Sequence, residues 1–111
     1  MAKTPEKKVK DKVVGVLKEE EVYYFFPATG GFGRSGVPDI VCCVNGYFLA
    51  LECKAGTNKP TALQVREIEA IRRSNGVAAV VNEENWDMVR ALVRKMKKGK
   101  NNEQQEHQEQ T

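Results

Sequence analysis

The chain has 111 residues, of which 41% are hydrophobic and 30% charged, and this size and composition are typical of one globular domain with a single modest core. No apolar run approaches the roughly 20 residues that a membrane-spanning helix needs, and no apolar signal segment follows the N-terminal lysines, so we expect neither membrane insertion nor export. The formal net charge of +3 is too small to identify a nucleic-acid-binding protein by itself.

The first part of the sequence predicts a helix, a strand and a glycine-rich loop. Thr4-Pro5 is typical of a helix start, with threonine as the N-cap and proline at the first helical position. Apolar residues then recur at helical spacing and predict a helix over about 5–20; they are Val9, Val13, Val16 and Leu17. The β-branched and aromatic run 22–26 predicts a strand. The segment 27–36 contains four glycines, so we expect a loop whose backbone can closely approach a ligand.

Two apolar runs, 37–44 and 47–53, flank Asn45-Gly46, a dipeptide typical of a two-residue hairpin turn. With these two residues in the turn, Asp39 is predicted to face Glu52 across the hairpin. Directly opposed residues point to the same face of a sheet, and Lys54, two residues after Glu52, lies on that face as well. A longer loop at this position would change the pairing.

The second part of the sequence predicts a helix, a buried strand and a last helix. Thr61 and Gln64 have the spacing of a capping box, which predicts a helix that ends near Ser74. The run 77–81 is continuously apolar and predicts a buried strand. Asn82 can cap the last helix, which has apolar residues along one side, namely Trp86, Val89, Leu92, Val93 and Met96.

The order α-β-β-β-α-β-α implies a three-layer α/β domain, with helices on both faces of a mixed sheet. We assign residues 1–96 to this single domain. The segment 97–111 contains no large apolar side chain to bury and is predicted to be a disordered tail. The last helix with the basic segment 94–100 could alternatively be an arm that binds a partner.

The three cysteines, Cys42, Cys43 and Cys53, do not form a disulfide framework or a zinc site. Their number is odd, and neighbouring residues on a strand point to opposite faces. The single histidine, His107, lies in the polar tail. We therefore expect buried, reduced thiols and a reducing compartment such as the cytoplasm.

Two opposed carboxylates in an otherwise apolar hairpin, which we expect to be covered on both faces, point to a metal site. Like charges in direct contact are destabilising and raise one pKa unless a cation lies between them. Oxygen ligands without histidine or thiolate suit Mg²⁺ or Mn²⁺. An ammonium group beside the metal, supplied by Lys54, would serve phosphodiester hydrolysis by orienting water or holding a phosphate oxygen. The alternative is that Asp39 and Glu52 are strand-end residues and that Lys54 merely pairs with one of them.

Pro38-Asp39 followed by Glu52-Cys53-Lys54 on the next strand resembles the signature of the PD-(D/E)XK nuclease superfamily, which implies a restriction-endonuclease-like core. More narrowly, the chain resembles the virus-type replication-repair nuclease (VRR-NUC) family over about residues 4–82. The residues that carry this resemblance are Glu6 and the segments 36–40, 51–56 and 61–64. Cys53 departs from the aliphatic residue often found at its position, but its side chain is expected to point away from the acids.

The resemblance implies roles for individual residues. Asp39, Glu52 and the backbone carbonyl of Cys53 would bind the metal, and Lys54 would be the catalytic base or a phosphate contact. Glu6 would complete a second metal site or hold a metal-bound water, although an acid in the first turn of a helix also complements the helix dipole. Gln64 would support the centre, although the capping box already accounts for it, and one side chain cannot easily serve both purposes.

Basic side chains could contact the DNA backbone without reading sequence, and these are Arg34, Lys3, Lys7, Lys8 and Lys59. They could equally form a solvated basic rim. Phe32, in the glycine-rich loop, could stack on an unpaired base or pin the loop.

The resemblance is to small phage enzymes that cut branched DNA in repair and recombination, often as homodimers, in the host cytoplasm if the protein is viral. The expected function is therefore that of a Mg²⁺- or Mn²⁺-dependent, structure-selective endonuclease, with Holliday-junction-like DNA as the substrate. One alternative is a sequence-dependent or general nuclease of the same fold. Another is a DNA-binding module that does not catalyse cleavage.

Overall fold

The computed structural model describes residues 3–28 and 33–110, with side chains up to Gly99. The elements in chain order are α1 (Pro5–Glu19), β1 (Tyr23–Phe25), β2 (Ile40–Val44), β3 (Tyr47–Cys53), α2 (Ala62–Arg73), β4 (Val77–Val81) and α3 (Met88–Gln110). This is the order expected from the sequence, and the mixed α/β class is confirmed.

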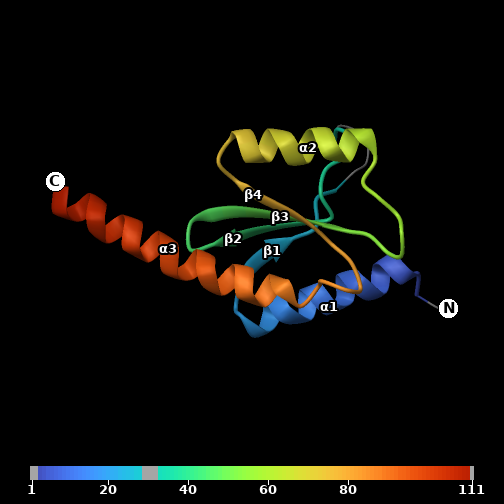
Figure 1. The fold of residues 1–111 in the computed structure, drawn as a ribbon, viewed down its shortest axis with the longest axis horizontal. Coiled ribbons are helices and arrows are strands. Elements are labelled where there is room, and N and C mark those ends of the chain that lie inside the picture. The colour runs from blue at the N-terminus through green and yellow to red at the C-terminus, as the bar shows by residue number, and fades with distance from the viewer. Residues whose placement is uncertain (1–2, 29–32, 111) are drawn as a thin grey trace.

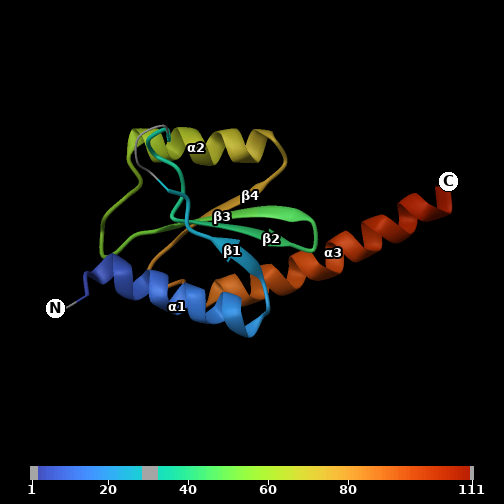
Figure 2. The same ribbon diagram turned by 180° about the vertical axis from the view of Figure 1, so that it is seen from behind.

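The four strands form one sheet in the order β1-β2-β3-β4, antiparallel except for the parallel pair of β3 and β4. Figure 1 shows α2 on one face of this sheet and α1 with α3 on the other, so the domain has three layers. The view from behind in Figure 2 shows the same arrangement, with the last part of α3 projecting beyond the sheet. The predicted mixed sheet with helices on both faces is therefore present.

The hairpin register is the one predicted from the Asn45-Gly46 turn. Val44 pairs with Tyr47, and at the far end Ile40 pairs with Leu51. Asn45 and Gly46 have φ angles of 53° and 89°, and a two-residue turn that matches the twist of its strands needs positive φ at both positions. Because Asp39 directly precedes β2, continuing this register brings it opposite Glu52.

The two faces of the sheet are covered unequally. The larger core lies between the sheet and the helices α1 and α3, and it includes the four apolar residues predicted for the first helix. The smaller cluster lies under α2 and consists of Ala50, Ile68 and Ala78. The prediction that both faces of the hairpin are covered is wrong for part of the α2 face, because Cys43 is exposed there and Phe48 is 46% exposed. Cys42 and Cys53 are free and buried as expected, whereas the expectation of a buried thiol is wrong for Cys43, which is free but exposed.

The last helix begins later than predicted. The Asn82 side chain accepts hydrogen bonds from the backbone N–H groups of Glu84 and Asn85, at 2.9 and 3.1 Å, so it caps a turn that precedes α3. Helix α3 continues to Gln110 and includes most of the predicted tail, but among the described side chains its buried core residues end at Met96. Disorder of this tail in solution therefore stays a prediction. In the described part of the chain, no helix is both long and apolar enough to cross a membrane.

Candidate active site

Asp39 and Glu52 lie together at the ends of β2 and β3. Glu52 occupies the last-but-one position of β3, where it pairs with Val80 of β4. The Oδ2 atom of Asp39 accepts a hydrogen bond of 2.8 Å from the backbone N–H of Cys53. This bond fixes the Asp39 carboxylate against β3, next to Glu52. The backbone of Lys54 is held in turn by β4, because its N–H donates to the carbonyl of Val81 at 2.9 Å.

Glu52 is the one charged side chain buried in the described part of the protein, with 2% of its surface exposed. Its Oε1 accepts from the Gln64 amide at 3.3 Å, whereas Oε2 is buried without a hydrogen-bond partner among the described residues. Burial, and then the closeness and charge of the Asp39 carboxylate, raise the pKa of Glu52 to about 8. The charge of Glu6 also raises this pKa, while that of Lys54 lowers it. The two acids therefore lie together as predicted, and the Lys54 ammonium is near enough for its charge to act on Glu52.

Gln64 performs both of the tasks that we expected to be difficult to combine. Its Oε1 accepts from the backbone N–H of Thr61 at 2.8 Å, which completes the capping box of α2. Its Nε2 donates to Glu52, so the two ends of one amide serve the helix and the acid. The expectation that one side chain cannot easily do both is wrong, because the first turn of α2 lies directly beside the end of β3.

Glu6 belongs to the same neighbourhood, although it stands on another element. It lies in the first turn of α1 and lines a hollow of about 690 Å³ together with the backbone segment that follows β3, including Ala55 and Gly56. Figure 1 shows the loop between β3 and α2 reaching down to the start of α1. Because the charge of Glu6 also acts on Glu52, Glu6 lies within electrostatic range of the acid pair.

The carboxylate pair has the chemistry that a hard divalent cation needs. When both acids are ionised neither can donate a hydrogen bond to the other, so a shared proton, a water molecule or a cation would be needed to satisfy the buried Oε2 of Glu52. The side chain of Cys53 points into the opposite core, where burial raises its pKa to about 12, so its thiol is turned away as expected. Within the described residues, no three His, Cys, Asp or Glu side chains are close enough to form a metal cage. A site here would therefore combine two carboxylates with backbone or substrate oxygens, as Mg²⁺ sites commonly do.

Of the five basic residues proposed to contact DNA, three have acidic partners. Lys3 and Lys7 each reach Asp11 at 2.6 Å, and these contacts lower the pKa of Asp11 to about 2. Arg34 pairs with Glu67 at 3.0 Å. Lys8 and Lys59 are exposed. Their contacts with DNA stay predictions, and Phe32 lies outside the described residues.

The glycine-rich loop contains a constraint that the sequence did not reveal. Gly36 has a φ of 85°, and a Cβ atom at this position would lie 2.6 Å from the backbone carbon and oxygen of Leu63. At Gly36 the close approach is made to the first turn of α2, and approach of the loop to a ligand stays a prediction. The contact ties the segment leading to Asp39 to the helix that carries Gln64.

Neither known protein-family models nor curated proteins gave a match to the sequence. Function is therefore inferred from the geometry of these side chains and from the motifs that contain them.

Proposed function

We propose that the protein is a divalent-metal-dependent DNA endonuclease whose active centre contains Asp39, Glu52 and Lys54. The observation that carries the proposal is the buried, unpartnered oxygen of Glu52 beside a second carboxylate. A fold without such a function has little reason to keep two acids in contact inside an apolar hairpin, because the pair destabilises the folded state whenever both are ionised. The proposed fold type is the restriction-endonuclease-like core, and the proposed family is VRR-NUC.

In this proposal each side chain of the centre has a role. Asp39 is oriented by the Cys53 N–H and Glu52 by the Gln64 amide, so both carboxylates are held before a ligand arrives. Lys54 is placed to hold a phosphate oxygen or to orient the attacking water. Bound Mg²⁺ or Mn²⁺ would polarise the phosphate and lower the pKa of a water molecule. Glu6, across the hollow from the loop after β3, would position that water or a second cation.

The preferred substrate in this proposal is branched DNA of the Holliday-junction type, cut by a homodimer. The motif resemblance supports this choice. The basic residues named above can contact phosphates, and such contacts do not read base sequence. Within this proposal, structure-selective cutting is therefore favoured over sequence-specific cutting.

The test is cleavage of end-labelled four-way junctions, flaps, nicked duplexes and linear duplexes by the full chain, with and without Mg²⁺ or Mn²⁺. We expect metal-dependent cutting of branched DNA, and its loss in Asp39→Ala, Glu52→Ala and Lys54→Ala. Glu84→Ala and Lys18→Ala remove exposed charges elsewhere and serve as matched controls that keep activity. Circular dichroism would verify that each variant folds.

The other outcomes separate the alternatives. Equal cutting of plain duplex would remove the structure-selective claim, and a defined cut position on linear duplex would indicate a sequence-dependent nuclease. DNA binding without cutting in Mn²⁺ would indicate a non-catalytic module and contradict the proposal.

A further inference from the structure

Three aromatic side chains are exposed on the face of the sheet that carries the two acids. Tyr23, Phe25 and Phe48 are 70%, 47% and 46% exposed. Tyr23 pairs with Cys43, which pairs in turn with Phe48, while Phe25 pairs with Val41. Paired residues share a face, and the same face continues along β2 and β3 to Asp39 and Glu52. We call these three side chains the aromatic face.

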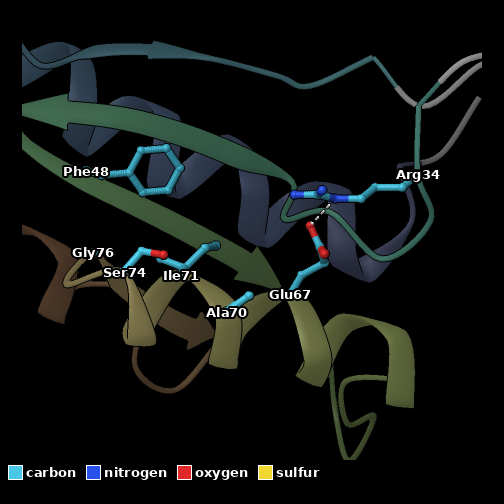
Figure 3. A pocket seen from close by; sticks show the side chains of 7 residues that line it. All are labelled: Arg34, Phe48, Glu67, Ala70, Ile71, Ser74 and Gly76. Carbon is cyan, nitrogen blue, oxygen red and sulfur yellow. Dashed lines mark hydrogen bonds and ion pairs between the residues drawn. The ribbon is translucent and has the colours of Figure 1, made fainter.

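The aromatic face borders a groove between the sheet and α2. The groove has a volume of about 370 Å³ and is lined by Arg34, Phe48, Glu67, Ala70, Ile71, Ser74 and Gly76. Figure 3 shows the Phe48 ring at one end and the Arg34–Glu67 pair at the end toward which β3 points. Apart from this ion pair, apolar, hydroxyl and glycine residues line it, so a flat, uncharged ring system can enter.

The groove and the aromatic face lead toward the acid pair. Phe48 precedes Glu52 by four residues on β3, which places it about 13 Å away along the strand. Phe25 lies in the row nearer to the acids, two strands away from β3. The Arg34 side chain is 79% exposed beside Glu67, so its guanidinium can also donate to a phosphate oxygen. A DNA strand that leaves the acid pair along this face would meet a cation first and aromatic rings next.

We propose that the aromatic face binds the unpaired bases of a DNA strand whose backbone passes the Asp39–Glu52 pair. This inference rests on the proposed nuclease function and assigns its substrate an unpaired segment. Tyr23 and Phe25 have ring centroids 6.4 Å apart. Exposed rings together with an arginine are features by which proteins bind single strands without reading sequence. A second copy of the chain could cover the same apolar face, but the shared face with the acids and the position of Arg34 favour DNA.

The test is fluorescence anisotropy with the full chain and end-labelled DNA, in chelator so that no strand is cut. The probes are a blunt duplex, the same duplex with a short single-stranded tail, and a third with an abasic tail that keeps the phosphates without the bases. We expect the base-containing tail to bind more tightly than the other two. Phe48→Ala and Tyr23→Ala should each weaken that binding about fivefold or more, since one stacked base contributes roughly 1–3 kcal/mol. Phe48→Tyr and Tyr23→Phe should retain it, and Met88→Ala, an exposed apolar residue on α3, should change nothing.

Equal affinity for the base-containing and abasic tails would overturn the inference, as would alanine variants that bind like wild type. Alanine variants that change the sedimentation mass and leave tail binding intact would identify a contact between copies instead. The readout is independent of turnover. If the protein showed no preference for the base-containing tail but still cleaved DNA with metal, only this inference would be contradicted. If it bound the base-containing tail more tightly but cleaved no DNA, only the proposed nuclease function would be contradicted.

Discussion

Replacing Glu52 with glutamine should remove a pH-dependent loss of stability from the metal-free protein. The pKa of Glu52 is raised from 4.5 to about 8 by burial and by Asp39, so the folded state binds this proton more tightly than the unfolded state does. Stability from this group is fully present below pH 4.5 and is lost as the pH rises through about 8. The loss amounts to about 3 kcal/mol by pH 7 and about 5 kcal/mol above pH 9, because a tenfold difference in proton affinity between the two states corresponds to about 1.4 kcal/mol.

The assay is urea unfolding of wild type and Glu52→Gln in chelator, from pH 5 to pH 9. Titrating groups that do not interact with Glu52, such as Asp11, contribute equally to both proteins and cancel in the difference between their unfolding free energies. We expect the unfolding free energy of Glu52→Gln to increase steadily relative to that of wild type as the pH rises, because glutamine cannot ionise beside Asp39. A difference that stays constant over this range would refute the reasoning, since it would mean that Glu52 ionises without cost in its buried position.

Three further changes test other parts of the structure. Gly36→Ala should destabilise the protein by more than Gly56→Ala. Both residues have positive φ, which costs an alanine roughly 1–2 kcal/mol of stability, but a Cβ atom at Gly36 would also lie 2.6 Å from backbone atoms of Leu63. Equal unfolding free energies of the two variants in urea would contradict the contact with α2. Gln64→Ala and Thr61→Ala should each cost roughly 1 kcal/mol of stability, because both break the capping box. Only Gln64→Ala should also weaken Mn²⁺ binding, because Gln64 donates to Glu52. Equal Mn²⁺ affinities of the two variants would show that Gln64 does not support the metal site. Val93→Ala should lower the unfolding free energy by roughly 2 kcal/mol, because this side chain is fully buried. Ending the chain after Lys100 should leave the thermal unfolding temperature unchanged. A truncated chain that melts at a much lower temperature would place core contacts in the tail.

The fold was predictable where local signals and hydrophobic patterns agree. Asn45-Gly46 specifies both the turn and the register, because the positive φ angles that it favours fit a two-residue hairpin. Once the register is known, strand periodicity places Asp39, Glu52 and Lys54 on one face. Thr4 and Thr61 mark their helices through side chains that accept backbone N–H groups. These are short-range effects, so the sequence contains them directly.

The features that sequence reasoning missed depend on contacts between elements. Cys43 and Phe48 are apolar strand residues, and only the position of α2 decides that they stay exposed. The double role of Gln64 requires the distance between α2 and the end of β3, and the need for glycine at residue 36 requires the position of Leu63. Asn82 was predicted to cap α3, but its side chain caps a turn that precedes this helix, a boundary that propensity alone does not fix.

The most direct test of the central claim is calorimetric titration of the full chain with Mn²⁺ at pH 7, in two buffers of different ionisation enthalpy. We predict saturable binding with release of about one proton per metal ion, because a carboxyl group with a pKa of about 8 is mostly protonated at this pH. Asp39→Asn and Glu52→Gln should abolish this binding, while Lys54→Met should retain it. Absence of binding to wild type, or an Asp39→Asn protein that binds Mn²⁺ equally well, would contradict the assignment of these two acids as a metal site.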